Sequence, residues 1–105
     1  MSTEEMIENI IDVSVKAYKR NSRGSIEASM LDQHRDVVVD GITFNYWREY
    51  VVYKVCEYLK DKCPEAEVEC NLKGNQSYIV VHLTDEQQKN LNVIMNKFLK
   101  TVGAI

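Results

Sequence analysis

An Asp-Gly pair at positions 40 and 41 interrupts a run of β-branched residues, and it constrains the fold more than any other feature of the sequence. Val37–Val39 precede the pair and Ile42–Phe44 follow it. Asp-Gly is a preferred two-residue loop of a type I′ β-hairpin, because both loop positions need a positive φ. Such a loop pairs Val39 with Ile42 and Val37 with Phe44, and it turns these four side chains to one face.

A second hairpin is expected further along the chain. Four apolar residues alternate with three polar ones over residues 66–72, which is typical of a half-buried strand: Ala66, Val68, Cys70 and Leu72 against Glu67, Glu69 and Asn71. Gly74-Asn75 marks a turn, and residues 76–83 form the partner strand. If these two residues alone make the loop, Cys70 faces Ile79 and the apolar faces coincide, whereas a three-residue loop would place Glu69 beside Ile79. We expect the two-residue register, with strand 76–83 central and strand 66–72 nearer an edge.

Three helices surround the hairpins in the sequence. Apolar residues recur at helical spacing over residues 3–20, over residues 46–62 and after Thr84, where Thr84 and Gln87 have the spacing of a capping box. The resulting order α-β-β-α-β-β-α predicts an α+β fold. We expect one four-stranded antiparallel or mixed sheet with helices packed on it.

Composition limits the function. The chain has 105 residues, a net charge of −3 and 45% hydrophobic residues, which predicts one domain, with residues 21–35 as an irregular connection. No stretch is long and apolar enough to cross a membrane. Glu4, Glu5 and Glu8 stand where a signal peptide needs positive charge, so we expect a cytoplasmic protein.

Cysteine usage agrees with a reducing compartment. Cys56, Cys63 and Cys70 are odd in number, and they occupy positions that the pattern predicts to be apolar. Zinc sites prefer closer Cys spacings, so even with His82 as a fourth ligand we expect no metal and no cofactor. The predicted register turns Cys70 and His82 to opposite faces, and we expect no catalytic residues. A small enzyme with a reactive cysteine is kept as a second alternative.

Aromatic residues are concentrated at the start of the second helix. Tyr46, Tyr50 and Tyr53 fall on its polar side, opposite the apolar stripe, and Trp47 stands among them. Tyrosine and tryptophan are favoured at protein–protein contacts, so we expect these four residues to bind a partner. In the alternative interpretation, the first helix or residues 21–35 cover the tyrosines within the chain.

The sequence therefore predicts a small non-catalytic interaction module: an adaptor, an inhibitor or a regulatory subunit. Its partner is another protein or a second copy, and a phage or mobile-element modulator fits the size and acidity. The alternative is a nucleic-acid-binding protein. Its basic residues, at the end of the first helix and just beyond, are Lys16, Lys19, Arg20 and Arg23. The net charge of −3 makes this alternative the weaker one.

Overall fold

The computed structural model describes residues 3–21, 37–39 and 41–105, and its elements place the chain in the α+β class. They are α1 (Thr3–Asn21), β1 (Val37–Val39), β2 (Ile42–Phe44), α3 (Trp47–Lys62), β3 (Glu67–Asn71), the 3₁₀ helix η1 (Gly74–Gln76), β4 (Tyr78–His82) and α4 (Asp85–Thr101). Of the irregular connection expected over residues 21–35, Asn21 belongs to α1 and the rest lies outside the described residues.

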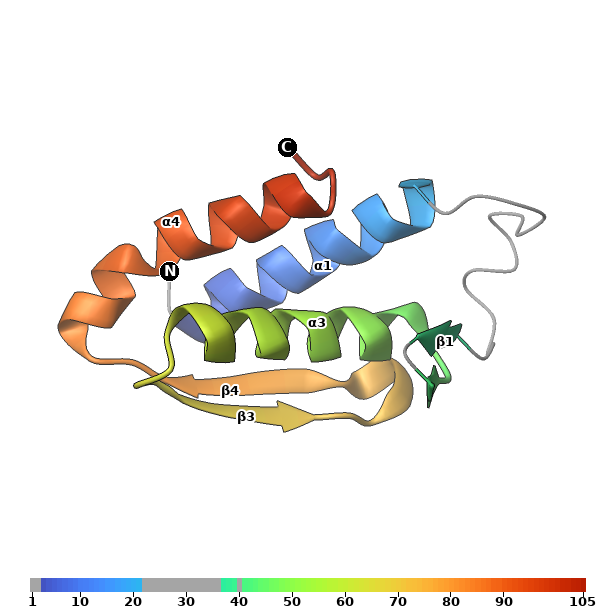
Figure 1. The fold of residues 1–105 in the computed structure, drawn as a ribbon, viewed down its shortest axis with the longest axis horizontal. Helices are drawn as coiled ribbons and strands as arrows, with labels where there is room; N and C mark the ends of the chain where they lie inside the picture. Colours follow the sequence, from blue (N-terminus) through green and yellow to red (C-terminus); the bar gives the residue numbers. More distant parts are fainter. Residues whose placement is uncertain (1–2, 22–36, 40) are drawn as a thin grey trace.

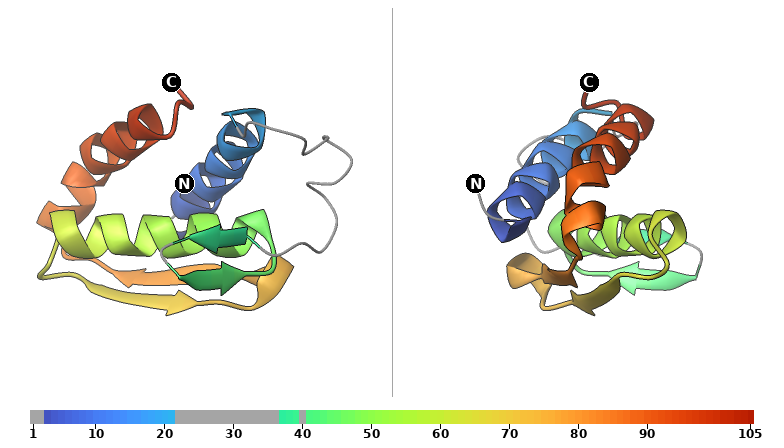
Figure 2. Two further views of the ribbon diagram at one scale, coloured as in Figure 1. Left: turned by 45° about the vertical axis from the view of Figure 1, so that its right-hand side comes forward. Right: turned by 90° about the vertical axis from the view of Figure 1, so that its left-hand side faces the viewer.

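Helices α1 and α3 both pack on the β3–β4 hairpin (Figure 1). α3 lies against β3 and η1, whereas α1 lies against β4 and beside α3. α4 contacts both α1 and α3 on the side away from the hairpin (Figure 2). The apolar sides of the three helices and the inner face of the hairpin therefore meet in one core.

The core confirms most of the expected apolar positions. It is made of Ile7, Ile10, Ile11 and Ala17 of α1, Val51, Val52, Val55, Cys56 and Leu59 of α3, Ile79 and Val81 of β4, Leu91, Met95 and Phe98 of α4, and Val102. Val13 belongs to the apolar half of the helical wheel of α1, yet it is 42% exposed, whereas the neighbouring Ser14 is fully buried. Ser14 lies three residues from both Ile11 and Ala17, so helical spacing places it on the same buried side of α1 as these two residues.

The first hairpin has the expected register. Val37 pairs with Phe44 and Val39 with Ile42, in antiparallel orientation. Gly41 has a φ of +78°, as a type I′ turn requires, while Asp40 lies outside the described residues. Phe44 is buried, although Ile42 on the same face remains 41% exposed.

The second hairpin also has the expected register, but its connection is longer. Cys70 pairs with Ile79 and Val68 with Val81. The strands end at Asn71 and resume at Tyr78, and η1 lies between them, so Gly74 and Asn75 alone do not form the loop.

The single four-stranded sheet is not confirmed. The described strands form two separate two-stranded sheets, and β4 pairs with β3 alone rather than lying centrally. The strands of the first hairpin are three residues long, and Phe44 packs on tyrosines of α3 instead of extending the other sheet.

Glu49, in the first turn of α3, ties the second hairpin to this helix. One carboxylate oxygen accepts a hydrogen bond from the backbone N–H of Asn45 at 3.0 Å, and the other accepts one from the N–H of Gly74 at 2.9 Å. Gly74 has a φ of +55°, and an added Cβ would lie 3.1 Å from the ring of Tyr46. The loop thus approaches the helix as closely as a glycine allows.

Arg48 joins three elements. From α3, its guanidinium donates to Glu8 and, at 2.9 Å, to Asp12 of α1. Its Nε donates to the carbonyl oxygen of Ser77, just before β4, at 3.0 Å. The Arg48 side chain is only 17% exposed, whereas both carboxylates are about half exposed.

We expect Arg48→Met to lower the free energy of unfolding by about 1–2 kcal/mol, because it removes the hydrogen bonds and ion pairs of the guanidinium, which we call the clamp, while keeping an apolar stem of similar length. The stability of Arg48→Lys should lie between those of the parent and Arg48→Met, since a lysine keeps the charge but has no planar fork. Urea unfolding measures the loss of stability relative to the parent, and this loss should shrink in 1 M salt, where the Debye length falls to about 3 Å. A urea unfolding curve of Arg48→Met identical to that of the parent would show that the clamp does not stabilise the fold.

Two buried serines allow a matched test. The Ser14 hydroxyl has no hydrogen-bond partner among the described residues, whereas that of Ser77 accepts from Lys73 N at 2.8 Å and donates to Gly74 O at 2.7 Å. Ser14→Ala should raise the free energy of unfolding by up to about 1 kcal/mol, and Ser77→Ala should lower it by about 1–2 kcal/mol. Urea denaturation of both variants measures the contrast, and equal losses would show that Ser14 is satisfied.

Candidate functional site

Aromatic side chains from three elements form one cluster near the N-terminal end of α3. We call it the aromatic cluster, and it consists of Tyr18 of α1, Phe44 of β2, and Trp47, Tyr50 and Tyr53 of α3. Tyr50 lies at its centre, with its ring centroid 5.2 Å from Tyr18 and 5.6 Å from Phe44. Both pairs are edge-to-face, which is a favoured arrangement of aromatic rings.

The Arg48 contacts and the buried apolar side of α1 together hold α1 beside the cluster. Asp12 of α1 binds Arg48, and Tyr18 follows Asp12 by less than two helical turns. The contact that docks α1 on α3 therefore also carries Tyr18 to Trp47 and Tyr50, whose rings lie 6.4 Å and 5.2 Å from it.

The four residues expected to bind a partner are all half-buried, which lies between the exposed face and the covered face that the sequence left as alternatives. Phe44 covers part of both Tyr50 and Tyr53, and α1 covers Tyr50 through Tyr18. Tyr46 is the N-cap of α3, and its ring lies against Gly74. The expected tyrosine stripe is thus divided, and only Trp47, Tyr50 and Tyr53 belong to the cluster.

Tyr18 and Phe44 are the members that the sequence did not single out. Helical spacing places Tyr18 among the apolar residues of its helix, and the hairpin register places Phe44 on one face with Val37, Val39 and Ile42. Burial, together with the adjacent Tyr50 hydroxyl, raises the pKa of Tyr18 to about 12. Its hydroxyl group is protonated at neutral pH, as an unshifted tyrosine also is, and it can donate as well as accept a hydrogen bond.

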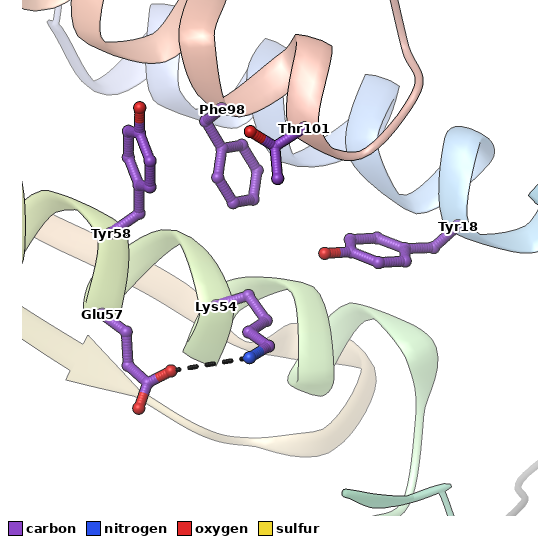
Figure 3. A pocket seen from close by; sticks show the side chains of 6 residues that line it. All are labelled: Tyr18, Lys54, Glu57, Tyr58, Phe98 and Thr101. Carbon is purple, nitrogen blue, oxygen red and sulfur yellow. Dashed lines mark ion pairs between the residues drawn. The ribbon is translucent and has the colours of Figure 1, made fainter.

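A pocket of about 300 Å³ adjoins the cluster, and Tyr18 belongs to both. The other lining residues are Lys54, Glu57 and Tyr58 of α3, and Phe98 and Thr101 of α4. Figure 3 shows the rings of Tyr58 and Phe98 side by side, with the Tyr18 hydroxyl pointing toward them from the opposite wall. Lys54 and Glu57 form an ion pair of 3.8 Å on the α3 side.

Another open pocket lies at the start of α4, with a volume of about 410 Å³. It is lined by Asp85, Gln88 and Lys89, which are exposed polar residues on one helix. Because ligand sites usually combine apolar walls with a few polar groups, the pocket beside the cluster is the better candidate.

The three cysteines are free thiols, and two of them lie next to each other. Cys56 of α3 is buried, and its thiol hydrogen-bonds to that of the half-buried Cys70 of β3. This hydrogen bond lowers the pKa of Cys70 and raises the pKa of Cys56, whose burial raises it further. Burial, followed by the nearby Glu65, raises the pKa of Cys63.

No Cys–His pair forms between Cys70 and His82. Cys70 pairs with Ile79 and packs against the core, whereas His82 pairs with Glu67 and is exposed. Alternate positions of a strand point to opposite faces, so the imidazole cannot activate this thiol. In the described ranges, no three His, Cys, Asp or Glu side chains gather in a way that could hold a metal ion.

The basic residues of the nucleic-acid alternative are only partly described. Lys16 is exposed on α1, and Lys19 and Arg20 lie in its last turns, although their side chains are outside the description. Arg23 lies outside the described residues altogether. Binding of nucleic acid through this group stays a prediction.

Comparisons with known proteins add no assignment. A scan against protein-family models finds no match, and searches of curated proteins and of solved structures find none either. Among the residues that the structure describes, no helix combines the length and apolar character that crossing a membrane requires.

The thiol arrangement predicts an order of reactivity. Cys70 should react first with iodoacetamide near pH 8, because its pKa is lowered and its side chain is half exposed, while Cys56 and Cys63 should react slowly. Mass spectrometry of peptides from a labelling time course measures the three rates. Cys70→Ser should remove the fast phase and no other, and a fast phase that persists in this variant would refute the assignment.

Proposed function

We propose that the chain is a non-catalytic protein-binding module, an adaptor, inhibitor or regulatory subunit, whose binding surface is the aromatic cluster. The observation that carries this proposal is that Trp47, Tyr50 and Tyr53 contact other rings and still keep part of their surface exposed. Rings held by their neighbours lose little conformational entropy when a partner covers them. Tryptophan and tyrosine are also the side chains that most often dominate binding energy.

A binding function explains why large aromatic rings stay partly exposed to water in the free protein, which lowers its stability. A large apolar ring gains about 25 cal/mol for each Å² that is removed from water, and half-buried rings forgo much of that gain in the free protein. A partner that covers Trp47 and Tyr53 would recover it. The proposal assigns no nucleophile, because His82 of the neighbouring strand points to the opposite face of the hairpin from Cys70 and cannot act as its base.

Site-specific cross-linking in the cell that produces the chain tests this proposal. The photoreactive residue p-benzoyl-phenylalanine is placed at Tyr53, where it resembles the native ring, and in a separate variant at Val93. Val93 is the matched control, because it is 56% exposed on α4 and belongs to neither the cluster nor the pocket. We expect a discrete protein adduct from position 53 that is absent from position 93.

A second substitution ties the adduct to the cluster. Trp47→Ala should reduce the yield of the adduct at position 53 about tenfold, which is the effect of losing one hot spot. The melt of each variant shows that the fold is retained. Equal adducts from both positions, or none from position 53, would reject the proposed surface, and an adduct that nuclease removes would favour the nucleic-acid alternative.

A further inference from the structure

The residues that line the pocket beside the aromatic cluster indicate which kind of side chain the pocket can bind. Three of its six lining residues are aromatic: Tyr18, Tyr58 and Phe98. The rings of Tyr58 and Phe98 contact each other, with centroids 5.3 Å apart and a tilt of 58°. An aromatic guest meets ring faces and edges here, and such pairs add to the stabilisation that burial alone provides.

Two polar groups of the pocket, on Glu57 and Thr101, keep capacity to accept a hydrogen bond, beside the hydroxyls of Tyr18 and Tyr58, which donate and accept, and the Lys54 ammonium, which donates. The Thr101 hydroxyl donates to the carbonyl oxygen of Lys97 at 2.9 Å, so its oxygen keeps capacity to accept. The Glu57 carboxylate is half exposed, and its only described cation, Lys54, lies 3.8 Å away, beyond a direct hydrogen bond. A guest that carries an N–H or O–H group on an aromatic ring can donate to one of these oxygens, which lie on different walls of the pocket.

We infer that this pocket receives an indole or phenol side chain, from an exposed tryptophan or tyrosine of the partner protein. The inference rests on the proposed function and names the anchor that the partner inserts. A volume of about 300 Å³ admits one such side chain. Tyr18 belongs to both the pocket and the cluster, so a partner that covers the cluster passes directly over the pocket opening.

The occupant is a different protein rather than a second copy. Tyr78 is the exposed tyrosine of the described residues, and it lies on the β3–β4 hairpin, away from the pocket. If its ring entered the pocket of another copy, the contact would join two unlike surfaces. Such head-to-tail contacts generate open chains unless their rotation closes a ring. We therefore assign the anchor to another protein and treat self-association as a contrary result.

Small probes test the pocket without knowledge of the partner. N-acetyl-tryptophanamide is titrated into the isotope-labelled full-length chain, and chemical shifts of the Thr101 methyl group and the Tyr58 and Phe98 rings are followed. We expect saturable shifts confined to the pocket, with a Kd on the order of 1 mM. N-acetyl-leucinamide, an aliphatic control, should bind at least about threefold more weakly.

The hydrogen-bond donor is tested separately with indole and 1-methylindole. The two share the ring system, but the methyl group removes the N–H donor. Indole should bind about threefold to tenfold more tightly, as for one hydrogen bond. Equal or tighter binding of 1-methylindole would overturn the assignment of a donor-bearing anchor, as would N-acetyl-leucinamide binding as well as the tryptophan probe.

A blocking variant shows whether the probes occupy this pocket. Thr101→Trp places an indole at the pocket wall and should weaken binding of N-acetyl-tryptophanamide at least about tenfold. Val93→Trp, on the exposed side of α4, is the control and should leave binding unchanged. Binding that survives Thr101→Trp would overturn the inference, and so would sedimentation showing that the chain assembles through Tyr78, with Tyr78→Ala abolishing assembly.

Combining the blocking variant with cross-linking separates the two proposals. If the adduct at position 53 persists undiminished in Thr101→Trp, the module binds a partner but places no anchor in the pocket, so only the present inference fails. If the probes bind the pocket but position 53 yields no adduct, the proposed surface fails while the pocket keeps its ligand preference.

Discussion

The guanidinium of Arg48, at the edge of the apolar core, fixes how α1, α3 and the start of β4 meet. One side chain of α3 binds two carboxylates of α1 and a carbonyl oxygen next to β4, so elements distant in the sequence take a single relative position. A planar fork with five donors suits this task, whereas an ammonium group on a flexible stem does not. Together with the buried apolar side of α1, this contact brings Tyr18 to the boundary between the aromatic cluster and the pocket.

Features governed by neighbours in the chain could be predicted from the sequence. The pairing of Val37 with Phe44 follows from the turn chemistry of Asp-Gly, and the reciprocal hydrogen bonds of Thr84 and Gln87 follow from their spacing. The relation between the two hairpins did not follow, because no local signal states which surface a three-residue strand joins. Phe44 packs against Tyr50 and Tyr53, and this contact depends on tertiary packing.

The candidate site was predictable only in part, for a related reason. A helical wheel places Tyr50 and Tyr53 off the apolar stripe, but it carries no information on what the neighbouring elements place over them, and Tyr50 packs against the core. Glu8, Asp12 and Arg48 read as ordinary surface charges until the fold brings them together. The pocket combines residues of three helices, and such a combination leaves no trace in the spacing of any single segment.

The close approach of Gly74 to Tyr46 means that two neighbouring aromatic residues, Tyr46 and Trp47, should evolve under different constraints. The Tyr46 ring fills the space that a side chain at position 74 would need, so substitutions at these two positions are coupled within the chain. Relatives of this protein should therefore retain or exchange Tyr46 and Gly74 as a pair, whatever partner they bind. Under the proposed function, Trp47, one residue further, is instead constrained by the surface of a partner protein. Its identity should diverge between lineages whose partners have diverged, while the pair beside it stays constant.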